Sequence, residues 1–141
     1  MLKKLESVKI PLLISFIFII FMSIFAYFKY YNFYDTFDLA VFNNLYFRFS
    51  NGLGFSSSLH NVSKLSIHFR PFLFFIYPIY LLFKTPEFFI YFQIICVGLS
   101  IIPLYYISEK ILNNRQLSLL ICIIYALYPP LINVTLYPFH P

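Results

Sequence analysis

Four polar side chains stand out in a chain that is otherwise mostly hydrocarbon: Asp38, His68, Arg70 and His140. A carboxylate or an imidazole can move a proton in general acid–base catalysis. A guanidinium can bind two oxygens of one phosphate or carboxylate group. An aspartate and two histidines could also hold a divalent ion, although the separations of these three follow no metal-site spacing. What they can do depends on which elements bring them together.

Asp38 gives the sharpest prediction of the four. At about 100° per residue it falls on the side of a helix that carries Phe42, Leu45 and Phe49, opposite a polar side rich in asparagine. An acid on an apolar side is costly unless it has a partner or a role. Two explanations stay open: a general base, or an acid in the first helical turn that the helix dipole stabilises. Asp35 is expected only to cap this helix.

The histidines and the arginine have simple explanations beside the chemical ones. Arg70 stands where a polar loop gives way to an apolar segment, so it could bind a phosphate or only reach back to the membrane surface. His68 could carry a proton, and His140 stands in a comparable Phe-His-Pro run. The spacing predicts no metal or other cofactor, and we assign no role to His60.

The composition is that of a protein dissolved in lipid. Of 141 residues, 61% are hydrophobic and only 11% are charged, whereas a soluble domain is about one quarter charged. The net charge is +5, but the basic residues form no tract, which argues against nucleic acid as a partner. The lipid bilayer is the expected partner. Cys96 and Cys122 lie within apolar runs and are expected to pack between helices.

The apolar runs predict an all-α integral membrane protein with a single membrane domain over residues 1–141. A run of about 20 residues can cross the bilayer as a helix. The predicted elements are transmembrane helices at 10–31, 88–107 and 117–134, an outer loop at 32–71 with a surface-lying helix at 36–51, and a short re-entrant or interfacial helix at 69–83.

Several residues mark the expected ends of these elements. Pro11 suits the first turn of the first helix, where a missing N–H costs little. Asn51-Gly52 is expected to end the surface helix, with loop over 52–67. The segment 109–115 reads as a short polar loop, and the last span is expected to break at Pro129-Pro130.

The lysines that precede the first span set the expected orientation. By the positive-inside rule, the N-terminus stays in the cytoplasm of the cell and the loop at 32–71 is extracytoplasmic. If 69–83 crosses the membrane, His140 ends in the cytoplasm. If it dips in and returns, His140 emerges on the side of Asp38. The rule favours the second topology, because the basic residues of 109–115 then lie inside.

The motifs, taken in order, resemble a prokaryotic family of predicted multi-span membrane proteins of unknown function. Asp38-Leu-Ala-Val-Phe42, then His68-Phe-Arg-Pro71, then Phe139-His-Pro141 are similar to that family's Y-D-L-G-x-F, H-F-S-P and F-H-P. Two positions depart from the pattern: Ala40 stands for the usual glycine and Arg70 for the usual serine. The family in turn looks like the GT-C membrane glycosyltransferases.

This resemblance implies a GT-C-like enzyme that takes a sugar from a polyprenyl-phosphate carrier at the outer face of the membrane, in the cell envelope. Asp38 would be the catalytic aspartate of the first outer loop and would activate the acceptor or orient the donor. His68 and Arg70 would lie near the phosphate, and His140 would help to close the site. The chain would be the N-terminal fragment of a longer polytopic protein, inactive alone. A transporter or channel component and a non-catalytic anchor subunit are the alternatives.

Overall fold

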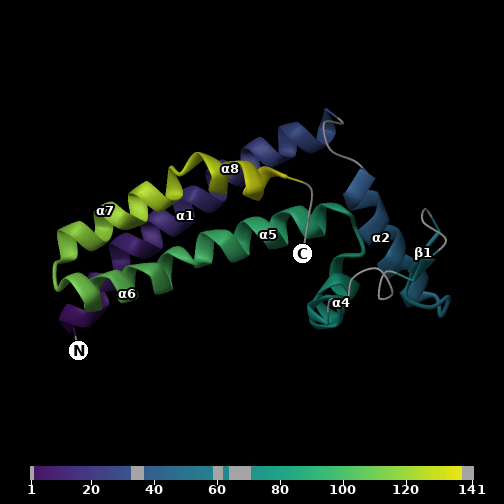
Figure 1. The fold of residues 1–141 in the computed structure, drawn as a ribbon, viewed down its shortest axis with the longest axis horizontal. Helices are drawn as coiled ribbons and strands as arrows, with labels where there is room; N and C mark the ends of the chain where they lie inside the picture. Colours follow the sequence, from purple (N-terminus) through teal and green to yellow (C-terminus); the bar gives the residue numbers. More distant parts are fainter. Residues whose placement is uncertain (1, 33–36, 59–61, 64–70, 138–141) are drawn as a thin grey trace. The chain divides into compact units, whose positions relative to one another are not determined.

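The computed structural model describes residues 2–32, 37–58, 62–63 and 71–137. Figure 1 shows that helices dominate the described chain, and this part of the fold prediction is confirmed. The elements are α1 (Leu2–Tyr31), α2 (Phe37–Ser50), β1 (Ser56–Ser57), β2 (Val62–Ser63), α4 (Phe72–Phe83), α5 (Glu87–Leu99), α6 (Ile101–Leu112), α7 (Arg115–Ala126) and α8 (Pro129–Leu136).

Two apolar helical segments in the described residues are long enough to cross a membrane. They are Val8–Tyr31 within α1 and Glu87–Leu112, which joins α5 and α6. The pair α7 and α8 makes a third span if it is counted as one, although it bends by 49°. The described chain therefore has two to three candidate spans, as a multi-pass membrane protein requires.

Helix α1 begins eight residues before the predicted span. Pro11 consequently lies inside the helix and is fully buried, so its expected place in the first turn is wrong. Hydropathy marks where lipid begins, whereas the helix continues into the polar residues before it. Because proline lacks an N–H, one backbone hydrogen bond to the preceding turn is missing at this point.

The second span also extends beyond its predicted end. Glu109 and Lys110 belong to the last turn of α6, not to a loop, because both are good helix formers. The turn that follows consists of Asn113, which has a left-handed φ of 49°, and Asn114, whose side chain accepts hydrogen bonds from the first amides of α7. The helical span is interrupted at one residue, Ser100, between α5 and α6. Pro103 follows three residues later and has no N–H group to donate a hydrogen bond to the preceding turn.

The last apolar run breaks at the predicted place. Helix α7 ends at Ala126 and α8 starts at Pro129, with Tyr128 in an extended conformation as its N-cap. A residue before proline avoids the helical region, and proline fits the first helical turn. The double proline therefore both ends one helix and starts the next.

The chain divides into two compact units, each with its own packing. Unit 1 consists of Met1–Phe28 and Tyr91–Tyr137, and Lys29–Ile90 belong to unit 2. In unit 1, the helices α6 and α7 form an antiparallel hairpin around the two asparagines (Figure 1). Helix α1 runs against the direction of α5 and α6, so its N-terminal end lies at the end of the unit where α6 meets α7.

Small residues bring the helices of unit 1 into contact. The Ser15 hydroxyl donates a buried 2.7 Å hydrogen bond to the Gly98 carbonyl. A Cβ atom on Gly98 would clash with Cγ1 and Cδ1 of Ile19. Cys122 is buried, and its thiol points at the Ile101 carbonyl, 3.8 Å away. This is the packing role expected of both cysteines, but it is wrong for Cys96, which is exposed. Small side chains at close approaches are typical of helices in membranes.

Unit 2 is built around aromatic rings. Helix α2 buries Leu45 and Tyr46, and the Tyr46 ring lies 5.0 Å from that of Tyr80 and 5.2 Å from that of Phe89. The predicted loop after α2 contains a two-stranded antiparallel ladder, β1 with β2, paired Ser56 to Ser63. Helix α4 has twelve residues, about 18 Å of helix, which is short of the roughly 30 Å of a hydrocarbon core.

Candidate functional site

Asp38 lies in the first turn of α2 and is half-buried. One and two helical turns further on, Phe42 and Leu45 are buried in unit 2, so the acid begins the row of side chains that packs inward. The carboxylate also stands near the free N–H groups of the helix start, where a negative charge is favoured. Both explanations of this acid, base and helix-stabilising group, fit that position.

Three of the four predicted site residues lie outside the described residues. His68 and Arg70 precede α4, whose first residue is Phe72, and His140 follows α8, which ends at Leu136. Their assignment stays a prediction, as does a metal site formed by Asp38 with the two histidines. Among the described residues, no group of three or more His, Cys, Asp or Glu side chains could hold a metal ion.

Side chains of α2 fix the helix that carries Asp38. The Tyr46 hydroxyl donates to the Leu73 carbonyl of α4, and the Tyr80 hydroxyl donates to Asn43 Oδ1 at 2.9 Å. Asn44 Oδ1 accepts from both the amide and the hydroxyl of Ser58, at 2.9 and 3.0 Å. Burial raises the pKa of the Tyr46 phenol, so that side chain stays neutral and donates. The asparagines predicted on a polar face are thus used inside the unit.

Arg48 lies in surroundings that its position in the sequence does not reveal. The residue is half-buried, and its Nε atom is buried without a hydrogen-bond partner among the described residues. A guanidinium in such surroundings is able to bind an anion. The sequence places Arg48 with the asparagines on the polar side of α2, and only its neighbours Phe47 and Phe49 indicate an apolar environment.

Gln93 is a second polar residue that sequence reasoning missed. Its Nε2 atom donates to the Val134 carbonyl at 2.7 Å, and it lies 3.4 Å from the carbonyl oxygens of Thr135 and Tyr137. Gln93 therefore binds the end of α8, where carbonyl groups lack helical partners. The sequence does offer one signal for this contact, since Gln93 is an amide side chain within an otherwise apolar span. In lipid, such a side chain usually forms a hydrogen bond to another helix.

A family of predicted membrane proteins matches most of the chain. The model of the DUF2079 family, described as predicted membrane proteins, matches residues 29–141. The match begins near the end of α1 and extends over all later helices. Neither a curated protein nor a solved structure is significantly similar to the chain. The expected resemblance to a family of predicted membrane proteins is confirmed at this level.

Proposed function

The chain belongs to the DUF2079 family of predicted membrane proteins, and we propose that it acts as a GT-C-type glycosyltransferase. Its donor would be a sugar on a polyprenyl-phosphate carrier at the outer membrane face. The observation that carries the proposal is the placement of Asp38, half-buried in the first turn of a helix that packs on its own aromatic core.

Asp38 would take the proton of the acceptor hydroxyl in this reaction. A bond from the acceptor oxygen to the anomeric carbon forms while the bond from that carbon to the phosphate oxygen breaks, and the phosphate leaves on its lipid. Arg70 would neutralise the charge that develops on the phosphate. His68 would lie near the same group, and His140 would help to close the site.

The direction of the helices in unit 1 supports a common side for these residues. Because α1 and the α5–α6 span run in opposite directions, the range Met1–Phe28 ends and the range Tyr91–Tyr137 begins at the same end of unit 1. The segment between these two ranges would then leave the membrane and re-enter it on the same side. Helix α4, within that segment, is too short to cross the bilayer easily, which agrees with this topology. In this proposed topology α8 ends on the side of the outer loop, and His140 would face the compartment of Asp38.

The positions of charged residues favour an enzyme over a transporter. In Val8–Tyr31, Glu87–Leu112 and the α7–α8 pair, every Asp, Glu, Lys and Arg lies within four residues of an end of the span. Ion and substrate pathways through membranes usually need ionisable residues at depth. The described spans carry none there.

The proposal is tested by transfer of a labelled sugar from a polyprenyl-phosphate carrier by the full-length protein in detergent. We expect Asp38→Asn to lower the rate by roughly 10²- to 10⁴-fold, the usual contribution of a general base. Asp35→Asn is the matched control, because asparagine caps a helix as well as aspartate does, and it should keep the rate. Full activity of Asp38→Asn would remove the assigned role. Wild-type protein that transfers no sugar from any carrier would remove the function.

A further inference from the structure

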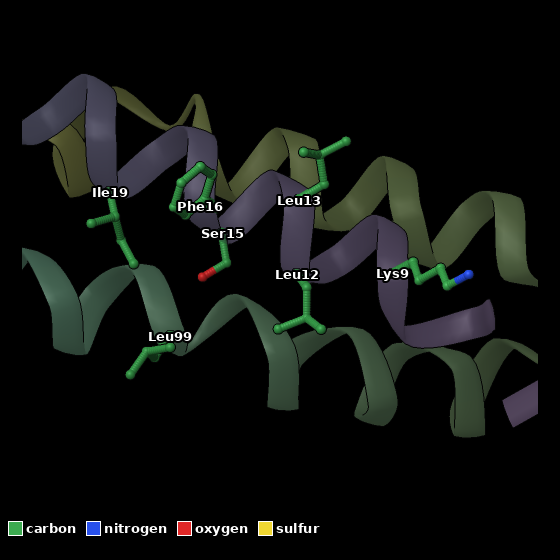
Figure 2. Close-up of a pocket in the computed structure, with 7 residues that line it drawn as sticks. All are labelled: Lys9, Leu12, Leu13, Ser15, Phe16, Ile19 and Leu99. Atoms are coloured by element: carbon green, nitrogen blue, oxygen red, sulfur yellow. The ribbon is translucent and has the colours of Figure 1, made fainter. Parts of the chain in front are cut away.

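A groove runs along the N-terminal half of α1 in unit 1. It has a volume of ≈ 480 Å³, and its wall is made by Lys9, Leu12, Leu13, Phe16 and Ile19 of α1 with Leu99 of α5. Figure 2 shows Lys9 at one end of this row and Ile19 at the other. We propose that the groove binds an acyl chain of an anionic glycerophospholipid and that Lys9 binds the phosphate of its headgroup.

Close contact between two helices sets the floor of the groove. Ser15 is buried there, and its hydroxyl is already used in the hydrogen bond to the Gly98 carbonyl. On the wall, Leu12, Leu13 and Phe16 expose much of their apolar surface. Lys9 is the one charged residue among those that line the groove. An occupant must be hydrocarbon along most of its length and polar only beside Lys9.

The length of the groove matches one leaflet of the bilayer. Ten residues separate Lys9 from Ile19, which is about 15 Å of helix. The hydrocarbon core is about 30 Å thick, so the groove spans about half of it. The candidate span starts at Val8, which places Lys9 at the boundary between hydrocarbon and headgroups. A phospholipid with its phosphate at that boundary has its acyl chain along the groove.

Charge selects the headgroup. Residues 3–9 contain three lysines and one glutamate, so this end of α1 carries a net positive charge that favours an anionic lipid. The groove starts near the N-terminal end of α1, at the end of unit 1 where α6 meets α7, and it shares no residue with the candidate site. The proposal therefore goes beyond the glycosyltransferase function, and neither depends on the other.

A single introduced indole can report on the groove, because the natural chain has no tryptophan. Phe16→Trp puts the reporter on the groove wall, where the native ring is 60% exposed. Phe25→Trp, at a position that is 47% exposed on the same helix but outside the groove, is the matched control. The protein is reconstituted in phosphatidylcholine vesicles with increasing fractions of dibrominated phosphatidylglycerol, whose bromine atoms quench a tryptophan in contact with them.

At position 16, we expect phosphatidylglycerol to be preferred roughly five-fold over phosphatidylcholine, because one lysine near the surface contributes about 1 kcal/mol to the binding of an anionic lipid. At position 25, we expect no preference. Adding Lys9→Gln should abolish the preference. Lys110→Gln, an exposed lysine in the last turn of α6, should leave it unchanged. Equal preferences at positions 16 and 25, or equal losses from Lys9→Gln and Lys110→Gln, would overturn the proposal in favour of general surface charge.

Discussion

Unit 1 and unit 2 differ in the side chains at their closest helix contacts. In unit 1, α1 and α5 approach closely at Ser15 and Gly98, and Phe16 is exposed although Tyr105 is buried. In unit 2, rings meet one another, and Tyr46 and Phe89 are fully buried whereas Phe75 is exposed.

The contact between Ser15 and Gly98 is of the kind expected between membrane-spanning helices. Lipid is as apolar as leucine, so burying hydrocarbon gains nothing there, and close backbone approach with a few hydrogen bonds must hold helices together. Unit 2 instead gathers buried rings around Tyr46, although α4 also exposes Phe75 and Leu82. Substitutions that remove or add volume should separate the two kinds of packing.

Phe89→Ala should have the largest effect and should act on unit 2. Phe89 is 0% exposed, and its ring lies 5.2 Å from that of Tyr46 and 5.4 Å from that of Tyr80. Truncating a buried phenylalanine costs about 3–5 kcal/mol. Hydrogen exchange of the α2 and α4 amides in micelles measures this loss. Phe75→Ala, at a position that is 75% exposed on α4, is the control and should change little. Equal protection in both variants would show that the rings do not hold unit 2.

Gly98→Ala should come next and should act on unit 1. The added methyl group meets Ile19 side-chain atoms, and overpacking typically costs about 1–3 kcal/mol. Unfolding of the purified protein by dodecyl sulfate in mixed micelles measures the change. Its neighbour Leu99 is 49% exposed, so Leu99→Ala should stay within about 0.5 kcal/mol of wild type. A Gly98→Ala protein as stable as wild type would mean that α1 and α5 do not need this close approach.

Tyr46→Phe should have the smallest effect at neutral pH, about 1 kcal/mol for one hydrogen bond, the bond to the Leu73 carbonyl. Tyr77→Phe removes an exposed 3.3 Å bond to Ser50 and should cost less. Because burial raises the pKa of Tyr46 above its ordinary value, the stability that its neutral form provides is complete below about pH 10 and is lost as the pH rises further. Alkaline hydrogen exchange of α2 should therefore accelerate more in wild type than in Tyr46→Phe. Identical pH profiles would contradict the burial of this phenol.

Local signals in the sequence predict much of the helical pattern. The end of α2 is an example: Gly52 has a φ of 71°, its amide donates to the Phe49 carbonyl, and the Leu53 amide donates to the Arg48 carbonyl. These bonds form the helix-ending motif that a glycine after an asparagine favours. The double proline in the last span acts just as locally. The prediction failed at Pro11 and Glu109 because hydropathy marks the part of a helix that lies in lipid and does not mark where the helix itself begins or ends.

The candidate site is less accessible from sequence because its partners are distant along the chain. Helical periodicity places Asp38 with Phe42 and Leu45, but it cannot show that Asn43 bonds to Tyr80 or that Gln93 holds the end of α8. Such bonds join residues about 40 positions apart and depend on how helices pack. His68, Arg70 and His140 remain predictions of the motifs alone.

The central claim is that the loop with Asp38 and the end of α8 face one compartment. Single cysteines test it most directly, in a protein whose Cys96 and Cys122 are replaced by alanine. Ser58→Cys reports the loop after α2, Tyr137→Cys the end of α8, and Gln116→Cys the start of α7; all three positions are exposed. With a membrane-impermeant maleimide on intact cells, we expect labelling at 58 and 137 but not at 116. Labelling of 58 together with 116, and not 137, would show that α4 crosses the membrane and would contradict the account.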